Sequence, residues 1–175
     1  MNLIEDIKKL ESTLSKKRME ENNRISMMVA TNADITEVFS PPRIAEAAKE
    51  MGLNPGESMD LLCGWDFSKS ADRKRAIEHV KTHRPFVAVG SPPCTLFSIL
   101  QGLNKHKLGA TWAATFEERK KDAIRHIEFC AAIYRLQSAS GRYWVHGHPA
   151  SATSWSLKTV LSLHSLPGVT NASSG

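Results

Sequence analysis

Apolar residues recur along the chain with two different periods. Near the N-terminus, apolar positions in residues 3–21 are separated by charged ones at roughly helical spacing, which predicts an amphipathic helix. Further along, short apolar runs bounded by turn residues predict strands. The predicted strands cover residues 34–39, 58–63, 85–90 and 142–147. The third run, PFVAVG, is apolar throughout, as expected of a buried parallel strand.

Helical patterns separate these strands. The predicted helices cover residues 41–52, 70–83, about 116–137 and 153–165, and the segment LNPGES predicts a turn. The first of them has proline at its start and Gly52 at its end, which are the usual positions of both residue types. Strands that alternate with helices predict an α/β fold, with a Rossmann-like, mostly parallel sheet and flanking helices.

The same pattern divides the chain into three parts. We expect an N-terminal helix within residues 1–24, an α/β domain over residues 34–167 and a flexible tail over residues 168–175. Four clear strands are visible and the chain stops soon after the fourth. The sheet is therefore expected to be incomplete at its C-terminal end, and whether the chain is a fragment of a longer protein stays open.

Length, composition and charge indicate the number of domains, the cellular compartment and the kind of partner. The 175 residues suit one domain, the formal charge is +5, and the three cysteines are too few for a disulfide framework. No apolar run is long enough for a transmembrane helix, and the charged N-terminus lacks a signal-peptide core. We expect an intracellular protein, cytoplasmic or nuclear rather than secreted, with no membrane partner. The mild positive charge permits an anionic partner such as DNA, although the basic residues of 69–84 and 119–125 are interleaved with acids and also suit a solvated face.

Three proline-containing segments follow predicted strands. They read FSPPRI after the first strand, GSPPCTLFS after the third and HGHPASATSW after the fourth. In an open parallel sheet, ligands bind at the carboxyl ends of the strands, near the point where the strand order reverses. We therefore expect these three segments to form the functional edge.

The middle segment resembles a known catalytic loop. Pro93-Cys94 and Phe97-Ser98 match, in order and spacing, the loop of DNA cytosine carbon-5 methyltransferases. The wider pattern, over residues 34–165, resembles a group of methyltransferase-like proteins. The resemblance implies a class I fold that binds S-adenosyl-L-methionine (SAM), acts in DNA methylation and uses Cys94 as the nucleophile.

The chemistry suits a cysteine on a rigid loop. Carbon-5 of cytosine becomes nucleophilic after a thiolate adds at carbon-6 of a flipped base, and Pro93 restricts the backbone beside Cys94. Two alternatives stay open. Cys94 can be a small residue that packs in a turn. Ser-Pro-Pro also resembles the loop of exocyclic-amino methyltransferases, although Cys94 stands where those enzymes have an aromatic residue.

The resemblance also suggests residues that contact SAM. Phe39 and Ser40 match the start of the family's Phe-Ser-Gly loop, with prolines in place of the glycine. Asp60 and Asp66 are candidates for ribose and adenine contacts, and Ser91 is a further candidate. The alternative for both aspartates is a capping or turn role.

The segment VHGHP holds the remaining candidates. The resembling group is expected to have His-Glu-His-Pro, with the glutamate as the acid, but this chain has Gly147 there. His146 or His148 could replace that acid because imidazole titrates near neutral pH, or both could be a polar strand end. Two histidines on one face could also bind a metal, but third and fourth ligands are missing, so no metal is predicted. Trp112, Trp144 and Trp155 either stack on a flipped base or pack in the core.

Two functional hypotheses follow. The first is a SAM-dependent methyltransferase that acts on cytosine in DNA. The second is an inactive relative that serves as a binding or scaffold module, or a fragment of a mobile-element or viral polyprotein. Present enzymatic activity, DNA against RNA as substrate, the target site and the oligomeric state are left open by the sequence.

Overall fold

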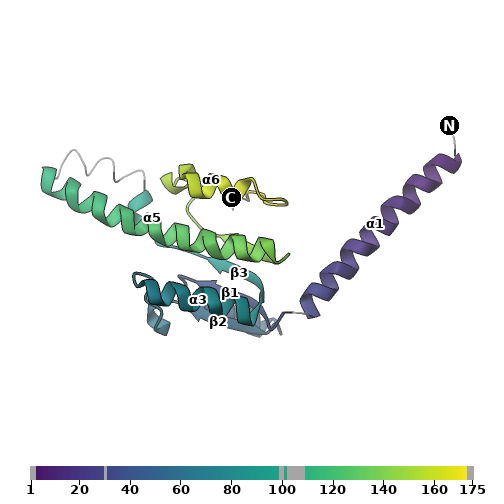
Figure 1. Ribbon diagram of the computed structural model, residues 1–175, viewed down its shortest axis with the longest axis horizontal. Helices are drawn as coiled ribbons and strands as arrows, with labels where there is room; N and C mark the ends of the chain where they lie inside the picture. Colours follow the sequence, from purple (N-terminus) through teal and green to yellow (C-terminus); the bar gives the residue numbers. More distant parts are fainter. Residues whose placement is uncertain (1–2, 30, 99–100, 102–108, 173–175) are drawn as a thin grey trace.

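A computed structural model of the protein describes residues 3–29, 31–98, 101 and 109–172 (Figure 1). The centre of the fold is a sheet of four strands, all parallel. The strands are β1 (Ala33–Val38), β2 (Pro55–Met59), β3 (Pro85–Gly90) and β4 (Tyr143–His146). The predicted α/β fold with a parallel sheet and flanking helices is confirmed in this coarse form.

The strand order is β2-β1-β3-β4. The chain moves from β1 to β2 on one side, then crosses over β1 to β3 and continues to β4 on the other side. The order therefore reverses between β1 and β3, where Val38 pairs with Gly90 at the carboxyl ends. In open parallel sheets this position is where ligands bind.

Helices cover the two faces of the sheet unequally. On one face lie α3 (Ser70–His83) and the long α5 (Gly109–Ala139), which packs on β3 and β4, with α6 (Lys158–His164) beside α5. On the other face α2 (Arg43–Glu50) packs on β1 and β2. A further helix, α1 (Leu3–Val29), extends away from this α/β body (Figure 1).

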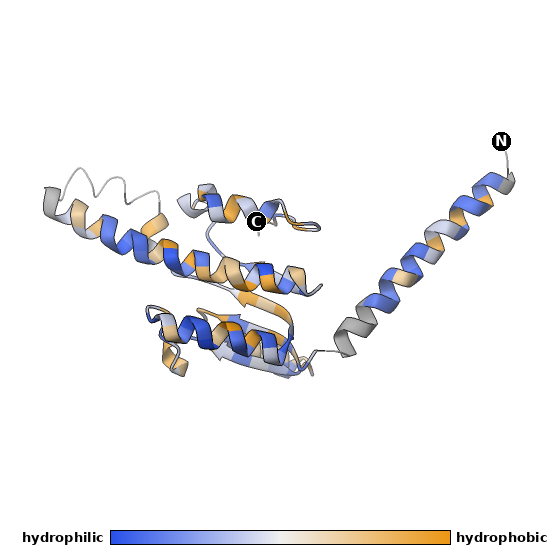
Figure 2. Ribbon diagram, viewed as in Figure 1, coloured by the Kyte–Doolittle hydropathy of each residue, from blue (hydrophilic) through white to orange (hydrophobic). Residues whose placement is uncertain are grey.

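The main core lies between the sheet and α3 and α5. Strand residues such as Val38, Met59 and Ala88 are fully buried there against Ile133 and Tyr134 of α5. A smaller cluster forms around Phe97, with Ile127 and Val160. In Figure 2 the strands of the body carry orange, hydrophobic residues, whereas α1 is largely blue with orange interspersed. The α/β body therefore has a core of its own, to which the exposed side chains described along α1 do not contribute.

Several predicted boundaries were wrong. The second strand begins at Pro55, inside the predicted turn, and residues 61–63 form a 3₁₀ turn, η1 (Leu61–Cys63), instead of strand. Pro55 pairs with Ile35, and a Cβ at Gly56 would overlap Thr36 Oγ1, so the glycine lets β2 approach β1 closely. Pairing in the sheet overrides the turn signal.

Three helices also differ from their predicted bounds. The N-terminal helix reaches Val29 and α5 begins at Gly109, so both are longer than their apolar stripes. The closing helix is interrupted at Leu157, whose backbone is extended, and divides into the 3₁₀ turn η3 (Thr153–Ser156) and α6. Within the described part of the chain, no helix combines the length and apolarity needed to cross a membrane.

Candidate functional site at the carboxyl edge of the sheet

Hydrogen bonds hold the loops after β1, β3 and β4 together. Ser91 N donates to Val38 O at 2.9 Å, which joins the exit of β3 to the exit of β1. Gly147 N donates to Gly90 O at 2.9 Å and joins the exit of β4 to that of β3. The segments that contain Phe39, Ser91 and His146 therefore lie next to one another, in keeping with the order β1-β3-β4 in the sheet.

His148 binds the loop after β3 with one ring nitrogen and η3 with the other. Its Nε2 lies 2.9 Å from Pro92 O, and its Nδ1 lies 2.6 Å from Ser154 Oγ. A carbonyl can only accept, so Nε2 carries the proton and Ser154 donates to Nδ1. Burial lowers the pKa of His148, which favours this neutral form. With both nitrogens engaged, His148 is a clamp between two loops.

Cys94 lies between two fixed points of its loop. Pro92 is buried and held by His148, and Phe97 is buried in the smaller core cluster. Between them Pro93 is exposed, and half-buried Cys94 precedes a 3₁₀ turn, η2 (Thr95–Phe97), where its carbonyl accepts from Phe97 N at 2.9 Å. The thiol is free of any disulfide, and no residue that the structure describes hydrogen-bonds to it. The sulfur is therefore half-buried and outside any disulfide at this edge.

His146 belongs to a buried polar chain beneath the same edge. Its Nδ1 lies 3.0 Å from Tyr134 Oη, and Tyr134 is also hydrogen-bonded to Cys130. Burial raises the pKa of Tyr134 well above its usual value, so the phenol keeps its proton. Burial and His148 lower the pKa of His146 to about 4. At neutral pH His146 is therefore an uncharged ring that shares one hydrogen bond with Tyr134 through Nδ1.

Nε2 of His146 is buried without a hydrogen-bond partner among the described residues. A buried polar atom without a partner is costly in free energy. Cys130 lies on α5, four residues before Tyr134, and is fully buried. Burial raises its pKa to about 12, which makes it unreactive. Of Cys94 and Cys130, Cys94 is the accessible thiol.

Two glycines shape the edge for different reasons. A Cβ at Gly90 would overlap Tyr134 Oη, so the tyrosine of the buried chain needs a glycine above it. A Cβ at Gly147 would lie 3.3 Å from Ser91 Oγ, which is tight but tolerable. A side chain at position 147 would therefore begin beside the loop of Cys94, but the chain has no carboxylate there.

The two aspartates proposed for SAM have local partners. Asp66 binds Ser68 through Oδ1 and Lys69 through Oδ2, and the hydrogen bond from Ser68 is the main cause of its lowered pKa. Asp60, directly after β2, accepts from Leu62 N at 3.0 Å with Oδ1. Asp60 takes the capping role and Asp66 takes the turn role, and Oδ2 of Asp60 stays without a hydrogen bond from a described residue.

Glu37 is a residue of this edge that sequence reasoning missed. It is completely buried and accepts three hydrogen bonds, from Ala45 N at 2.7 Å, Ser58 Oγ at 3.1 Å and Ser40 Oγ at 2.6 Å. The Ala45 amide belongs to the first turn of α2, so the chain supplies its own anion to that helix end. Ser40, proposed as a cofactor contact, is engaged here. A glutamate within a strand gave no signal, because such a residue is normally exposed.

Phe39, two residues after Glu37, has a left-handed backbone with φ 59°, which is unusual for a phenylalanine. Its ring lies 4.7 Å from that of Phe67 and 5.0 Å from that of His126 on α5, measured between centroids. Burial lowers the pKa of His126. His126 was also missed, because the pattern of its helix indicated an apolar face for packing and a basic face for solvent. Strained backbone of this kind is often found at binding sites.

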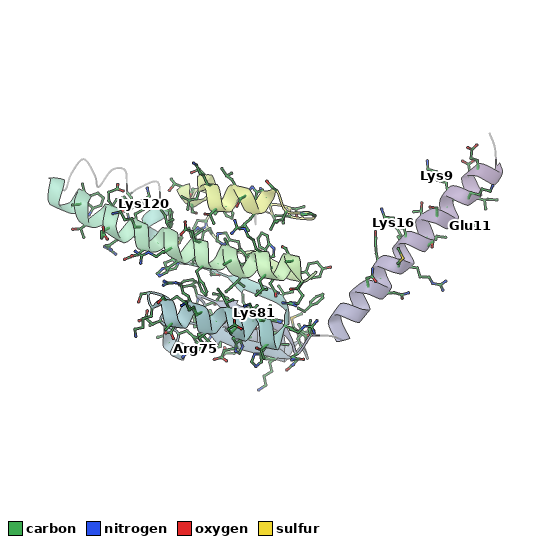
Figure 3. The ribbon with its side chains drawn as sticks, viewed as in Figure 1. Lys9, Glu11, Lys16, Arg75, Lys81 and Lys120 are labelled. Atoms are coloured by element: carbon green, nitrogen blue, oxygen red, sulfur yellow. The ribbon has the colours of Figure 1, made fainter. Side chains whose placement is uncertain are left out.

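The tryptophans and basic helices take mostly structural positions. Trp144 stacks on Tyr134 at 4.6 Å, Trp112 stacks on Phe116 at 4.9 Å, and Trp155 donates to Pro149 O. Arg75, Lys81 and Lys120 lie on the outside of α3 and α5 (Figure 3). Short ion pairs along the helices, such as Lys81–Glu78, fit a solvated face.

Two cavities lie near this region. One of about 550 Å³ runs along the outer side of β4 and is lined by Trp144, His146 and Trp155, and one of about 330 Å³ lies over α2 and β2. Cys94 lines neither of them. Among the described residues, no three His, Cys, Asp or Glu side chains are grouped as a metal site requires.

No protein-family model, characterised protein or solved structure matches this sequence.

Proposed function

We propose that this protein is a SAM-dependent methyltransferase-type domain that acts on cytosine in DNA, with Cys94 as the nucleophile. The observation that carries the proposal is the position of Cys94. Its half-buried thiol lies between an anchored proline and an anchored phenylalanine, at the carboxyl edge of an all-parallel sheet. Such an arrangement holds a sulfur in place with little conformational freedom left to lose.

Cys94 would act on a base turned out of its helix. The thiolate adds to carbon-6, forming a carbon–sulfur bond and placing negative charge on carbon-5 and the ring. Bound SAM would supply the methyl group for carbon-5. Loss of the carbon-5 proton then allows the carbon–sulfur bond to break, which returns the thiolate and the methylated base.

His146 is the group that could stabilise the charged ring. At neutral pH it is uncharged, so it would offer a hydrogen bond and would not transfer a proton as an imidazolium, and its buried Nε2 would reach a base only if the edge opens. His148 is committed to Pro92 and Ser154. A site without a strong general acid loses about 10²–10⁴-fold in rate, so the expected activity is low.

The segment after β2 suits SAM better than the segment after β1. Asp60 Oδ2 is a suitable acceptor for a ribose hydroxyl at the end of β2. After β1, however, Pro41 and Pro42 offer no N–H groups, and Glu37 already binds the first turn of α2. A carboxylate placed at that helix end would be repelled by Glu37. Binding of SAM is therefore assigned to the Asp60 side.

The second candidate function is a non-catalytic binding or scaffold module of the same fold. Two residues favour it. The carboxylate of Glu37 binds a backbone N–H in the first turn of α2, and Gly147 stands where the acid is expected. The two functions differ in what they require of Cys94, because only catalysis needs a reactive thiol.

Titration calorimetry with SAM tests the cofactor. We expect weak binding that Asp60→Asn reduces about tenfold, while Asp34→Asn, at the opposite end of the sheet, leaves it unchanged. If the native protein gives no binding heat even at the highest SAM concentration that can be reached, the methyltransferase function is contradicted and the binding module is favoured.

A DNA oligonucleotide that contains 5-fluorocytosine tests the nucleophile. Fluorine at carbon-5 blocks the elimination, so the protein should be trapped as a covalent adduct when SAM is present. Cys94→Ser should abolish the adduct, and the exposed Cys63→Ser should not. An adduct that persists in Cys94→Ser would refute the role of this cysteine.

A further inference from the structure

A cavity of about 550 Å³ lies on the outer side of β4. Helix α6 and residues 167–172 also border it, and Cys94 is not among the described residues that line it. Its volume falls within the range of about 300–1,000 Å³ that is typical of small-molecule sites. The chemistry of its walls therefore indicates what kind of ligand it suits.

Two tryptophans line this cavity. Trp144 stacks on Tyr134 of α5, with ring centroids 4.6 Å apart and planes at 13°, so one face of its indole is covered and the opposite face is left for the cavity. Trp155, from η3, donates its indole N–H to Pro149 O at 2.8 Å, which fixes the position of the ring. Helix α6 adds buried apolar side chains. Such walls suit the flat, apolar body of an aromatic molecule.

Arg142, the residue directly before β4, gives the cavity its permanent charge. No Asp, Glu or Lys is among the described residues that line the cavity. Arg142 is only 8 % exposed, and its Nε donates to Oε1 of Gln137 at 2.8 Å. Neither terminal nitrogen has a hydrogen-bond partner in the described part of the chain, and neither is sealed from solvent. A ligand in the cavity can therefore reach this end of the guanidinium.

The positive charge of Arg142 is not balanced by an acid. None of the ion pairs between described residues includes it. Burial and then the like charge of Arg84 lower its pKa, and no acidic group among the described residues opposes these effects. The guanidinium nevertheless stays protonated at neutral pH. A charge buried without a partner is unfavourable, so an anion gains more by pairing with it there than at an open surface.

The free end of the guanidinium suits two oxygen atoms. Because Gln137 holds Nε, the two terminal nitrogens present a fork that pairs with both oxygens of a carboxylate or phosphate. From Arg142 to His146 the chain rises about 13 Å, which leaves room for a bicyclic ring beyond the anionic group. Nε2 of His146 is buried, so this residue contributes a wall and no hydrogen bond from that atom.

We propose that the cavity beside β4 binds a small aromatic anion, whose carboxylate or phosphate pairs with Arg142 and whose ring packs against Trp144 and Trp155. A buried guanidinium at one end and indole rings along the wall are the two features that carry the inference. It is independent of the proposed function, because neither Cys94 nor Asp60 is among the described residues that line the cavity.

Titration calorimetry with three probes that share one ring system tests the charge. The probes are 2-naphthoate, 2-naphthyl phosphate and the neutral 2-naphthamide. At least one of the two anions should bind about tenfold or more tightly than the amide, because only an anion pairs with the guanidinium. The tighter of the two identifies the anionic group. Equal affinities for all three probes, or no binding of any probe up to its solubility limit, would overturn the inference.

Two arginine variants locate the anion. Arg142→Met keeps an unbranched side chain but removes the charge, and should weaken binding of the anionic probe by about tenfold or more while 2-naphthamide binds as before. Arg84→Met is the matched control, because it removes a nearby exposed charge that does not line the cavity, and should leave the affinity nearly unchanged. Equal losses in the two variants would mean that the general positive charge of this region attracts the anion, and would overturn the inference.

A second pair of variants does not depend on the folding of Arg142→Met, which leaves Oε1 of Gln137 without its partner. Val145 lines the cavity and is 52 % exposed, so Val145→Trp should fold, place a ring in the cavity and weaken binding by about tenfold or more. Leu161→Trp is the control, at a position that is 51 % exposed on α6 and does not line the cavity. Circular dichroism confirms that each variant is folded. Unchanged binding in folded Val145→Trp would place the ligand elsewhere and overturn the inference.

Discussion

His148 donates its Nε2 proton to the carbonyl of Pro92, 2.9 Å away and 56 residues earlier in the chain. The bond crosses from the loop after β4 to the loop after β3, two strands that are neighbours in the sheet. Because Pro92 begins the double proline before Cys94, the position of the cysteine depends on a residue that was itself a candidate for catalysis. The histidine positions the loop through a carbonyl, and its own nitrogens are not available to a substrate.

Removal of this clamp should loosen the loop of Cys94. For His148→Ala we expect a loss of about 1–3 kcal/mol in unfolding free energy, since Pro92 O and Ser154 Oγ both lose a partner. Alkylation of Cys94 by iodoacetamide should become faster, because the loop opens more often. The exposed His164→Ala is the control. Unchanged alkylation in His148→Ala would contradict the clamp.

Glu37 should be essential to the start of α2. Replacement by alanine leaves Ala45 N and Ser58 Oγ without an acceptor in a buried place, while Ser40 Oγ keeps Pro41 O, and should cost about 2–4 kcal/mol in unfolding free energy. Glu37→Gln keeps an acceptor oxygen and should cost less. Denaturant unfolding measures both, and Glu46→Ala, on the exposed side of α2, provides the baseline. Glu37→Ala that unfolds like Glu46→Ala would show that the three hydrogen bonds do not form.

His146 should make the fold sensitive to acid. Its pKa is about 4 in the folded protein, against 6.5 for an ordinary histidine. Between these values the unfolded chain binds more protons than the folded one, so stability must fall as the pH is lowered through this range. The loss from this one group between pH 7 and pH 4 is about 3 kcal/mol.

The measurement is the unfolding free energy at a series of pH values from 7 down to 4, a range set by that lowered pKa. His146→Gln should reduce the slope against pH, even though its stability at neutral pH also changes. Burial also lowers the pKa values of His79, His126 and His148, so part of the slope will remain. Identical slopes for the native protein and His146→Gln would show that His146 is not buried as a neutral ring.

Two glycines on neighbouring strands should respond differently to the same substitution. Gly90→Ala forces a methyl group into Tyr134 Oη and should cost about 1–3 kcal/mol or more in unfolding free energy. Gly147→Ala places its methyl 3.3 Å from Ser91 Oγ, an exposed side chain that can move, and should cost well under 1 kcal/mol. Thermal unfolding of the pair compares them. Equal costs would argue against the buried Tyr134–His146 chain, whose tyrosine lies below Gly90.

Local patterns predicted the type of element well and its ends less well. The helix at residues 70–83 and the strand at residues 85–90 match the structure in full. The strand that begins at Pro55 was read as a turn, because proline and glycine signal turns locally. Pairing with β1 reversed that signal, and no information about pairing is present in a window of neighbouring residues.

For the candidate site, the sequence predicts the loops that form it but not the partners of their side chains. The rule that ligands bind at the carboxyl ends of parallel strands predicts a site at the loops of Cys94 and His146, and the structure brings these two loops together at one edge of the sheet. The partners of each side chain could not be derived, since Pro92 and His148 are 56 residues apart and Tyr134 reaches His146 from a helix. Glu37 was missed because its hydrogen bonds come from Ser40, Ser58 and α2, which only folding brings together.

By itself, then, the sequence determined the alternation of helices and strands, the parallel sheet and the three loops at its carboxyl edge, since these depend on periodicity and on turn residues. The tertiary structure decided which groups stay available in those loops. It engaged His148, Ser40 and Asp66 in hydrogen bonds, made His146 a neutral ring and left the thiol of Cys94 free. The physical reason is that hydrogen-bond partners and burial depend on contacts between distant segments, which local sequence does not encode.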